Sequence, residues 1–354
     1  MALPPLFPPA QSGRNERGGA SDYESCVAKR DADGAARRPY HKTSMTEFDL
    51  IAKLTKSLPV NDTVVTGAGD DCAVLDFGLP EKLFLFKTDA VVEGVHFTRE
   101  TPPEKIGRKA LGRCLSDIAA MAGTPAAALI TIGLPRHFNP EFVAKIYDGL
   151  NALARTVGVA IVGGETTTNP GGIFISVALL GTVGRGKQIL RNGARTGDAI
   201  FVTGELGGSL AGKHLDFEPR IVEARWLADH FPIHAMADLS DGLAGDLRHI
   251  LTASHVGAEL LKTAIPVSRA AKVQSKKGSS AKPPVIAALT DGEDFEFLFT
   301  IASKDAVKLL DAWRQQFPKL KLSCIGKIVG GGGITLRDKN GSQKLDVRGY
   351  AHFG

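Results

Sequence analysis

The sequence predicts an α+β fold built from two domains. Its 354 residues provide enough chain for two ordinary domains. Apolar runs of strand length alternate with longer amphipathic segments, and several neighbouring runs are separated only by turn residues, as in β-hairpins. This mixture favours an α+β fold over a doubly wound parallel sheet. The turn GRGK at residues 184–187 is the expected boundary, which gives domains at residues 45–184 and 185–354.

In the first domain, helices and strands are expected in alternation. The helix at 104–122 begins after Pro102, because proline fits the first turn of a helix. The strand at 83–88 is apolar enough to be buried. The remaining helices are expected at 48–58 and 141–157, and the remaining strands at 72–76, 126–133, 159–162 and 173–183.

The second domain continues the alternation. Its helices are expected at 219–230, 242–252 and 304–317. Its strands are expected at 199–203, 235–238, 295–301 and 322–329.

The composition is that of a soluble globular protein, with 43% apolar and 23% charged residues. No window approaches the ~18 uninterrupted apolar residues of a membrane helix, and the proline-rich N-terminus lacks the pattern of a secretory signal. The four cysteines are far apart and show no metal-binding spacing: Cys26, Cys72, Cys114 and Cys324. We therefore expect reduced thiols, a cytoplasmic location and no contact with a membrane.

The net charge of +5 comes from two segments that are poor in core-forming residues. Residues 1–44 carry seven Lys or Arg and five Asp or Glu, and residues 262–282 carry six basic residues and no acidic one, so the rest of the chain is net acidic. We interpret them as a disordered leader and as a basic surface loop within 260–284. Neither segment interleaves aromatic residues with its charges, so no nucleic-acid partner is expected. Folded structure is expected to begin near Met45, which is consistent with a start codon there.

Two glycine-rich stretches, GTVGRGKQ and GGSLAGKH, match only the first part of a P-loop. The residue after the lysine should be a Ser or Thr that binds Mg²⁺, but it is Gln188 or His214. Both stretches are interpreted as tight turns.

Acidic residues recur at the ends of expected elements and give a stronger signal. Asp70 and Asp71 precede one strand, and Thr88 with Asp89 follows the next. Other acidic residues follow strands further along the chain, namely Glu165, Asp238 and Asp241. Ser240 or Asp241 can cap the helix that follows, but capping does not account for Asp238.

Asp117 falls inside the apolar stripe of the helix at 104–122, between Cys114 and Met121. A buried carboxylate requires a partner or a proton. Arg113, four residues earlier, is the local candidate for an ion pair. Taken together, however, the carboxylates would repel one another strongly unless cations lay between them. Oxygen ligands without Cys or His suit Mg²⁺, so the residues predict a site for several Mg²⁺ ions and a nucleotide or phosphate.

At these residues the sequence resembles the thiamine-monophosphate kinase family of the aminoimidazole ribonucleotide synthetase superfamily. The motifs GAGDDCAV, KTDAVVEGVHF, LSDIAAMAGTPAAAL, VGGETT, ADLSDGLAGDL, DGEDFEFLFT and GYAHF occur in the family's order, from about Met45 to Gly354. The resemblance implies a two-domain α+β fold with a C-terminal α/β sandwich. It also implies a homodimer formed through the N-terminal sheets in a barrel-like interface.

The resemblance further implies that ATP phosphorylates thiamine phosphate to thiamine diphosphate with the help of Mg²⁺. The positions that match the family's metal ligands are Asp71, Thr88, Asp89, Asp117, Glu165, Asp238 and Asp241. The positions that match ATP contacts are Gly164, Glu165, Arg191 and Ser240. Those that match thiamine phosphate contacts are His96, Glu293 and Tyr350. Asp70 is a weaker candidate ligand.

Two positions depart from the family's pattern. Glu165 stands where a metal-binding Asp is usual, and Lys87 stands where a Ser is usual. Lys87 can remove one metal contact while it supplies a fixed positive charge. Together these residues leave the number of bound metals open.

The acceptor of the implied reaction is an ionised phosphate, so no general base is expected. Two other hypotheses stay open. One is another ATP-using enzyme of the same superfamily, of the aminoimidazole ribonucleotide synthetase or selenophosphate synthetase type. The other is a non-catalytic nucleotide-binding regulator with altered metal ligands such as Glu165.

Overall fold

The computed structural model describes residues 47–276, 281–347 and 349–350. Residues 47–354 form one compact unit, and the description concerns that unit. The expected leader, Cys26 and the last residues of the GYAHF motif lie outside the described residues. In the described part of the chain, no helix is both long and apolar enough to cross a membrane.

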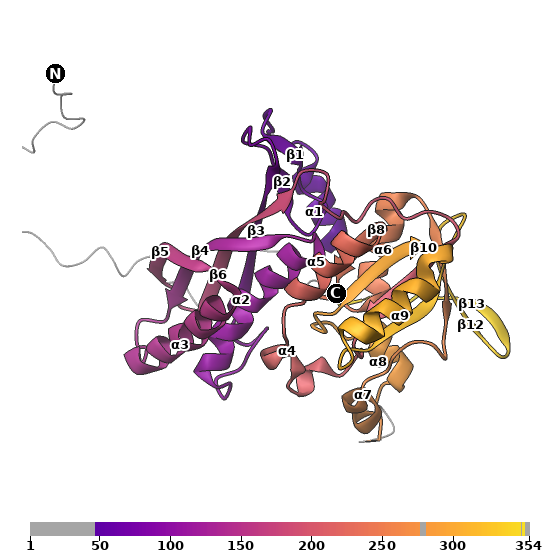
Figure 1. Ribbon diagram of the computed structural model, residues 1–354. Coiled ribbons are helices and arrows are strands. Elements are labelled where there is room, and N and C mark those ends of the chain that lie inside the picture. The colour runs from indigo at the N-terminus through magenta and orange to yellow at the C-terminus, as the bar shows by residue number, and fades with distance from the viewer. Residues whose placement is uncertain (1–46, 277–280, 348, 351–354) are drawn as a thin grey trace, which may run out of the picture. The chain divides into compact units, whose positions relative to one another are not determined.

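The N-terminal lobe, residues 47–184, contains a six-stranded sheet in the order β1-β2-β3-β6-β4-β5 (Figure 1). The strands are β1 (Val64–Thr66), β2 (Ala73–Leu75), β3 (Lys82–Val92), β4 (Thr124–Leu134), β5 (Ala160–Thr168) and β6 (Phe174–Gly184). Neighbouring strands are antiparallel except for the parallel pair β4 and β5. The crossover between these two strands is the helix α3, as a parallel pair requires.

The helices α2 (Pro103–Ala120) and α3 (Pro140–Val157) pack on one face of this sheet. Local sequence sets the ends of α3: the side chain of Asn139 accepts hydrogen bonds from Glu141 N and Phe142 N, and Gly158 takes the left-handed conformation after the last turn. A shorter helix, α1 (Glu47–Thr55), precedes the sheet. Helices α2 and α3 bury one side of β2, β3, β4 and β6 in a single apolar core.

The other face of the six-stranded sheet carries exposed apolar side chains. In β6 buried and half-buried residues alternate, as expected for a strand with one face in the core. Phe86, Leu129 and Val162 expose 47%, 47% and 62% of their surface. The edge strands β1 and β5 do not pair with each other, so the sheet is open in the described residues and forms no closed barrel.

The C-terminal lobe is built on a seven-stranded sheet in the order β13-β12-β9-β11-β7-β10-β8. Its strands are β7 (Asp198–Thr203), β8 (Ile233–Asp238), β9 (Gly257–Leu261), β10 (Phe297–Ala302), β11 (Leu322–Val329), β12 (Gly333–Asp338) and β13 (Gly341–Lys344). Its helices are α4 (Lys213–Asp216), α5 (Ile221–His230), α6 (Leu243–Ser254), α7 (Arg269–Gln274), α8 (Pro284–Thr290) and α9 (Ala306–Gln316). Two short 3₁₀ segments, η1 (Ser209–Ala211) and η2 (Ser303–Asp305), complete the lobe.

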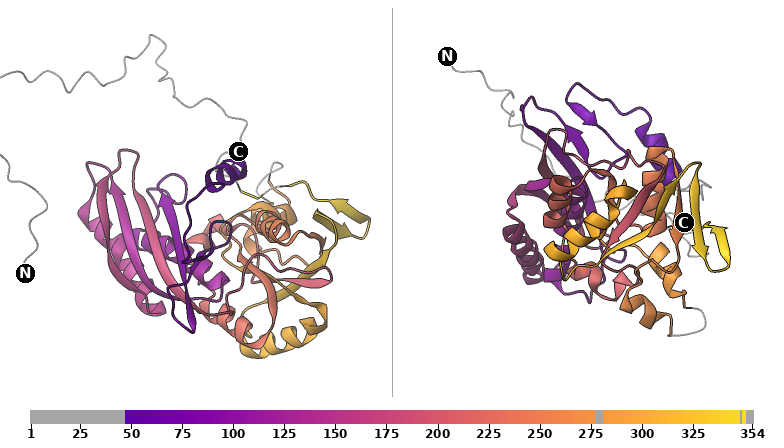
Figure 2. Two further views of the ribbon diagram at one scale, coloured as in Figure 1. Left: turned by 90° about the horizontal axis from the view of Figure 1, so that it is seen from above. Right: turned by 45° about the vertical axis from the view of Figure 1, so that its right-hand side comes forward.

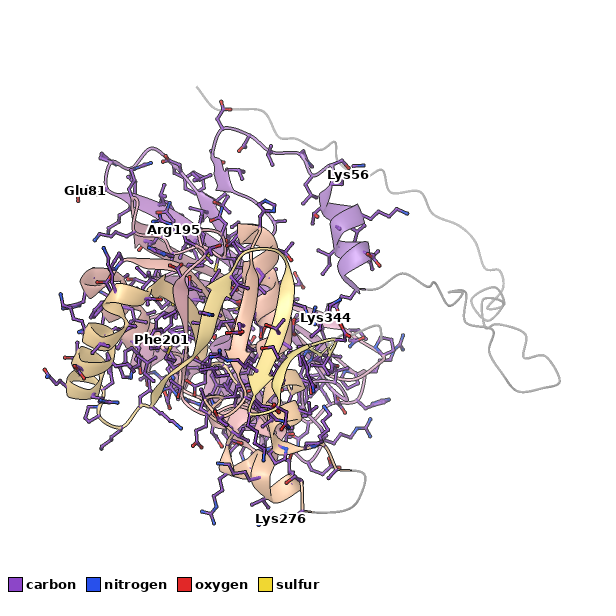
Figure 3. The ribbon with its side chains drawn as sticks, turned by 90° about the vertical axis from the view of Figure 1, so that its right-hand side faces the viewer. Lys56, Glu81, Arg195, Phe201, Lys276 and Lys344 are labelled. Atoms are coloured by element: carbon purple, nitrogen blue, oxygen red, sulfur yellow. The ribbon has the colours of Figure 1, made fainter. Side chains whose placement is uncertain are left out.

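Helices cover this sheet on both faces, because its central strands are apolar on both sides. All six residues of β7 are buried. Ile200 and Val202 belong to the core beneath α6 and α8, whereas Phe201 belongs to the core beneath α5 and α9. Figure 3 labels Phe201 within the C-terminal lobe and Lys344 on the outer strand β13. The lobe is therefore an α/β sandwich.

Helix α2 lies between the two lobes (Figure 2). Side chains spaced by one or two helical turns reach across to the C-terminal lobe. Lys105 Nζ is 2.6 Å from Asp216 Oδ2, Lys109 Nζ is 2.7 Å from Glu293 Oε2, and Ser116 Oγ is 2.7 Å from Asp238 Oδ2. This polar stripe holds the two lobes together along the candidate site.

The principal helices and the two-lobed α+β architecture agree with the sequence-based expectations. Two expected strand ends were wrong: β3 continues to Val92 and β5 to Thr168, so Thr88, Asp89 and Glu165 lie within strands instead of after them. The expected basic loop at 260–284 was also wrong, since α7 lies inside it and α8 begins at Pro284. Residues 277–280 of that segment lie outside the described residues. The strands β1, β9, β12 and β13 and the helices α4, α7 and α8 were missed.

Candidate active site

Three of the predicted metal ligands meet in a buried cluster between the lobes. Asp71 precedes β2, Asp117 lies on α2 and Asp238 ends β8. Each offers a carboxylate oxygen, and these three atoms lie within 4.8 Å of one another. The residues expose only 1%, 5% and 2% of their surface. We call this group the carboxylate triad.

The adjacent residues Asp70 and Asp71 have different partners. Both oxygens of Asp70 accept backbone hydrogen bonds, Oδ1 from Asp71 N at 2.9 Å and Oδ2 from Arg191 N at 3.0 Å. Asp71 Oδ1 instead accepts from the Arg191 guanidinium, at 3.2 Å from Nε and 2.5 Å from Nη2. Burial, and then the neighbouring Asp71, raise the pKa of Asp70 to about 6. Asp70 therefore fixes the loop, and Asp71 belongs to the triad.

Lys87 supplies the fixed positive charge that the sequence suggested. Its Nζ is 3.1 Å from Asp117 Oδ1, and the attraction to Asp117 raises the pKa of the lysine well above its ordinary value despite the burial that opposes it. Arg113, the expected partner of Asp117, forms its ion pairs with Asp89 and Glu293. Lys87 and Arg191 thus offset two of the triad's three negative charges.

The remaining electrostatics of the triad favour a cation. Burial raises the pKa of Asp117 well above its usual range and that of Asp238 to about 7, and repulsion between the carboxylates adds to both shifts. Asp71 Oδ2 and Asp238 Oδ1 are buried and have no hydrogen-bond partner in the structure. Buried acceptors of this kind are rare unless a proton or an ion satisfies them. An oxygen-only set of hard ligands fits Mg²⁺.

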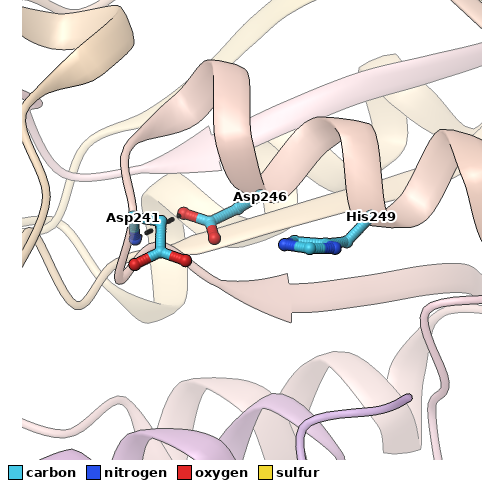
Figure 4. Close-up of side chains that lie close together, drawn as sticks. All are labelled: Asp241, Asp246 and His249. Carbon is cyan, nitrogen blue, oxygen red and sulfur yellow. Dashed lines mark hydrogen bonds between the residues drawn. The ribbon is translucent and has the colours of Figure 1, made fainter. Parts of the chain in front are cut away.

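A second group lies at the start of α6, where Asp241, Asp246 and His249 come together (Figure 4). One ligand atom from each lies within 4.8 Å of the others. Asp246 Oδ2 accepts a hydrogen bond from Asp241 N at 3.1 Å. Burial, and then Asp241, raise the pKa of Asp246, and burial lowers the pKa of His249 to about 4. A carboxylate oxygen of Asp241 thus lies within 4.8 Å of ligand atoms of Asp246 and His249, two residues that were not predicted from the sequence.

The predicted acceptor residues line one pocket beside Asp241. Its wall includes His96, Glu293 and Tyr350, together with Ser240 and Asp241. Glu293 N donates to Ser240 O at 2.7 Å, and Tyr350 N donates to Asp241 O at 2.9 Å. Hydrogen bonds along the main chain therefore bring three distant segments to the same pocket. We call it the acceptor pocket.

Glu293 adopts an unusual backbone conformation and is held by cations. Its φ is +63°, which is strained for a residue with a side chain. Lys109, fully buried, donates to Glu293 Oε2 at 2.7 Å, and Arg113 Nη1 lies 3.3 Å from Oε1. Hydrogen bonds from His214 and Lys109, together with the attraction to the two cations, outweigh burial and lower the pKa of Glu293 to about 2. The carboxylate is therefore ionised and fixed in direction.

His96 is held by a hydrogen bond from the main chain to its imidazole ring. Its Nδ1 accepts from Val92 N at 3.1 Å, so Nε2 carries the proton in the neutral imidazole. Lys109 Nζ also donates to the carbonyl oxygen of His96, at 2.6 Å. Lys109 therefore anchors two residues of the acceptor pocket, one from each lobe.

Other predicted residues lie apart from the triad. Asp89 is on β3 and pairs with Arg113, at 3.4 Å. Thr88 is exposed, on the opposite face of β3 from Lys87 and Asp89, and its Oγ1 is 3.3 Å from Ser176 Oγ. Gly164 and Glu165 lie on the edge strand β5, separated from β3 by β4 and β6. Within one chain, the structure does not bring Thr88, Gly164 and Glu165 to the triad.

Gly164 has a structural requirement of its own. A Cβ atom at this position would lie 1.8 Å from Ile130 O, and its φ is +155°. The glycine lets β5 approach β4 closely. Glu165 is exposed, and its Oε1 accepts from Thr166 N at 3.0 Å.

Sequence reasoning missed the polar residues that hold the site together: Lys109, Ser116, His214 and Asp246. The first two recur on α2 at helical spacing within a largely buried helix, and this spacing was the available signal. No pattern indicated the partners of His214, namely Lys109 and Glu293, because they come from distant segments, or the hydrogen bond that Asp246 accepts from Asp241 N.

Comparison with known proteins identifies both lobes. The family models of AIR synthase related protein match residues 69–183 with the N-terminal domain and residues 195–339 with the C-terminal domain. The fold and the buried carboxylates thus define a member of the AIR synthase related class.

Individual relatives are more specific. A thiamine-monophosphate kinase of Rhodopirellula baltica is 38% identical over 306 residues, which cover 84% of this chain and 93% of the relative. That of Bacillus subtilis is 31% identical over 336 residues, covering 87% and 100%. The structure of AaThiL complexed with AMPPCP and TMP has a TM-score of 0.72 at 30% identity, and the match covers 87% of this chain and 97% of that one. The chain belongs to the thiamine-monophosphate kinase family.

Proposed function

We propose that this protein transfers the terminal phosphoryl group of ATP to thiamine phosphate, which forms thiamine diphosphate. The observation that carries the proposal is the position of the carboxylate triad next to the acceptor pocket: Asp238, a member of the triad, is followed three residues later by Asp241 in the pocket wall. The relatives named thiamine-monophosphate kinase, and the AaThiL structure with AMPPCP and TMP, support it independently. Among the alternatives within the superfamily, these relatives favour the thiamine phosphate kinase.

Mg²⁺ fits the triad, because two buried carboxylate oxygens there have no hydrogen-bond partner. Asp71, Asp117 and Asp238 would hold the ion, and Asp241 with Asp246 offers further oxygens. When bound, Mg²⁺ neutralises phosphate charge. The ammonium group of Lys87 already neutralises one negative charge of the triad. We therefore propose that the site binds fewer Mg²⁺ ions than its seven candidate metal ligands would suggest.

The chain's own residues position the two substrates. Phosphoryl transfer requires mainly alignment and charge neutralisation. Arg191, held by Asp71, and Ser240 are proposed to contact ATP, and His96, Glu293 and Tyr350 to contact thiamine phosphate. The His96 tautomer directs an N–H group from Nε2, which suits a phosphate oxygen. No general base is required, because the attacking phosphate oxygen is already ionised near neutral pH.

We further propose that a second copy of the chain covers the exposed face of the six-stranded sheet in a barrel-like homodimer. Phe86, Leu129 and Val162 give this face an apolar surface that suits such an interface. Thr88 lies on the same face of β3 as Phe86, and Glu165 is also exposed. Within one chain, Thr88, Gly164 and Glu165 do not reach the triad. In the proposed dimer, these residues of one chain contribute to the site of the other. Size measurements in solution for wild type and Leu129→Asp test this: the variant should be monomeric, and an unchanged dimer would contradict the interface.

Domain boundaries near residue 184 and a cytoplasmic location complete the proposal. The two sheets are formed by residues up to Gly184 and from Asp198 onward. Cys72, Cys114 and Cys324 are free thiols, which suits a reducing compartment.

A coupled ADP-release assay tests the function. ADP formation should require both Mg²⁺ and thiamine phosphate, and mass spectrometry should detect thiamine diphosphate. Asp241→Asn should reduce the rate most at limiting Mg²⁺, whereas Asp229→Asn, on α5, serves as the control. ADP release that is independent of thiamine phosphate, or nucleotide binding without turnover, would favour another enzyme or a regulator.

A further inference from the structure

We propose that Arg113 binds the phosphate group of the acceptor and thereby makes the enzyme select thiamine phosphate over unphosphorylated thiamine. This inference rests on the proposed function and adds the residue that recognises the phosphate. The positions that match the family's ATP and thiamine phosphate contacts do not include Arg113.

Arg113 is placed where the two substrates must meet. It lies on α2 and lines the acceptor pocket, and its guanidinium lies between Asp89 Oδ2, 3.4 Å from Nε, and Glu293 Oε1, 3.3 Å from Nη1. Asp89 is a proposed metal ligand and Glu293 a proposed acceptor contact. Among the described residues that line this pocket, Arg113 is the only lysine or arginine.

The charges around the pocket require such a cation. Its wall carries Asp241 and Glu293, and a phosphate brings further negative charge into the same space. Lys109 already holds Glu293 at 2.7 Å, closer than the 3.3 Å contact from Arg113. The carboxylate of Glu293 therefore keeps a strong partner if the guanidinium turns toward a phosphate.

The geometry of the guanidinium also suits a phosphate. The two contacts of Arg113 with Asp89 and Glu293 are long and use two of its five N–H groups. Arginine binds phosphate oxygens with two parallel hydrogen bonds, which gives both strength and orientation. The 14% of the Arg113 side chain that is exposed lies in a pocket wall, so a ligand can reach it.

Arg113 and the carboxylates of the pocket thus recognise different parts of the acceptor. The carboxylates Glu293 and Asp241 suit the positive ring of thiamine, whereas Arg113 suits its phosphate. Unphosphorylated thiamine lacks the group that Arg113 binds. Loss of the guanidinium should therefore weaken thiamine phosphate binding about ten- to a hundredfold, the range for a lost hydrogen-bonded charge pair, and leave thiamine binding nearly unchanged.

The test is equilibrium binding of thiamine phosphate and of thiamine, by calorimetry, to wild type and to Arg113→Met and Arg113→Lys. Arg108→Met is the matched control, because Arg108 lies on the same helix and contacts Phe217 O and Glu218 outside the pocket. Arg113→Met should lose the preference for thiamine phosphate, Arg113→Lys should recover part of it, and Arg108→Met should keep it. In the kinase assay, the KM for thiamine phosphate should rise in Arg113→Met, and the KM for ATP should not.

The outcomes distinguish this inference from the proposed function. If wild type binds and phosphorylates thiamine phosphate but Arg113→Met weakens both ligands equally, or neither, the role of Arg113 is refuted and the function stands. If wild type does not bind thiamine phosphate, both fail. If Arg113→Met does not fold, Arg113→Lys decides, because it keeps the charge and replaces the fork of the guanidinium by a single ammonium group. An undiminished preference in that variant would then refute the inference.

Discussion

Replacing the buried Lys109 by methionine should destabilise the protein strongly. Lys109 is 0% exposed, and its Nζ contacts His96 O at 2.6 Å, Glu293 Oε2 at 2.7 Å and His214 Nδ1 at 2.9 Å. Two of these atoms, His96 O and Glu293 Oε2, accept hydrogen bonds from the charged ammonium group, and His214 Nδ1 is a close polar neighbour. Burial lowers the pKa of Lys109, and Glu293 opposes this shift by stabilising the charged form. Lys109→Met would leave the carboxylate of Glu293 without its closest cation.

The expected loss is about 3–5 kcal/mol, the cost of removing one partner from a buried ion pair. In a domain of this size each kcal/mol lowers Tm by about 2 °C, so the melting temperature should fall by about 6–10 °C. Thermal and urea unfolding, followed by circular dichroism, measure both quantities. Lys105→Met is the matched control: Lys105 also joins α2 to the C-terminal lobe, but its side chain is 41% exposed, and the change should cost less than about 1 kcal/mol.

A double variant separates the lost charge pair from lost packing. Glu293→Gln removes the orphaned charge, so Lys109→Met combined with Glu293→Gln should be more stable than Lys109→Met alone. If Lys109→Met melts like the Lys105→Met control, or if the effects of the two substitutions simply add, the account of Lys109 as a buried charge that stabilises Glu293 is wrong.

Two further predictions concern the charges of the site, and a third concerns Asp294, a buried residue whose carboxylate accepts from Gly207 N at 3.1 Å and 2.9 Å. Asp71→Asn should raise the Mg²⁺ concentration for half-maximal activity about tenfold or more, as measured in the ADP-release assay; an unchanged value would remove Asp71 from the metal ligands. Lys87→Met makes the triad more negative by one charge, so calorimetric titration should show tighter Mg²⁺ binding; weaker binding would contradict the ion pair with Asp117. Asp294 has its pKa raised by burial from 3.8 to about 7, so its contribution to folding becomes unfavourable as pH rises from about 4 to 7. With a chelator present, Asp294→Asn should therefore gain stability relative to wild type over this range, by up to about 4 kcal/mol; a gain that is equal at pH 4 and pH 8 would refute the shift.

The sequence predicted most of the large elements, because long amphipathic helices and apolar strands carry a periodic signal. Helices α2 and α3 were expected within one or two residues of their observed ends. The missed elements lack such a signal. β1 has three residues, β12 follows a run of glycines, and α8 begins after prolines in a basic segment. Tertiary packing stabilises α8, whose Ala288 and Leu289 are fully buried.

The candidate residues were predictable from their chemistry, but their partners were not. Helical spacing suggested Arg113 as the partner of Asp117, because residues four apart share a helix face. The structure instead pairs Asp117 with Lys87 of β3, thirty positions earlier in the chain, a contact that depends on how α2 packs on the sheet. Likewise, the alternation within β3 places Thr88 on the opposite face from Lys87, and Asp89 shares the face of Lys87 because the strand continues to Val92.

The adjacent carboxylates of Asp70 and Asp71 show why the site depends on both lobes. Asp70 accepts the backbone N–H of Arg191, and Asp71 accepts its guanidinium, so one residue beyond the N-terminal sheet holds both acids of the loop. In the opposite direction, Ser116 of the N-terminal lobe donates to Asp238 of the C-terminal lobe at 2.7 Å. Each lobe therefore supplies the partner that fixes a triad carboxylate of the other. The triad exists only when the lobes are docked, so a substitution that loosens α2 from the C-terminal lobe should weaken the site without changing any of its ligands.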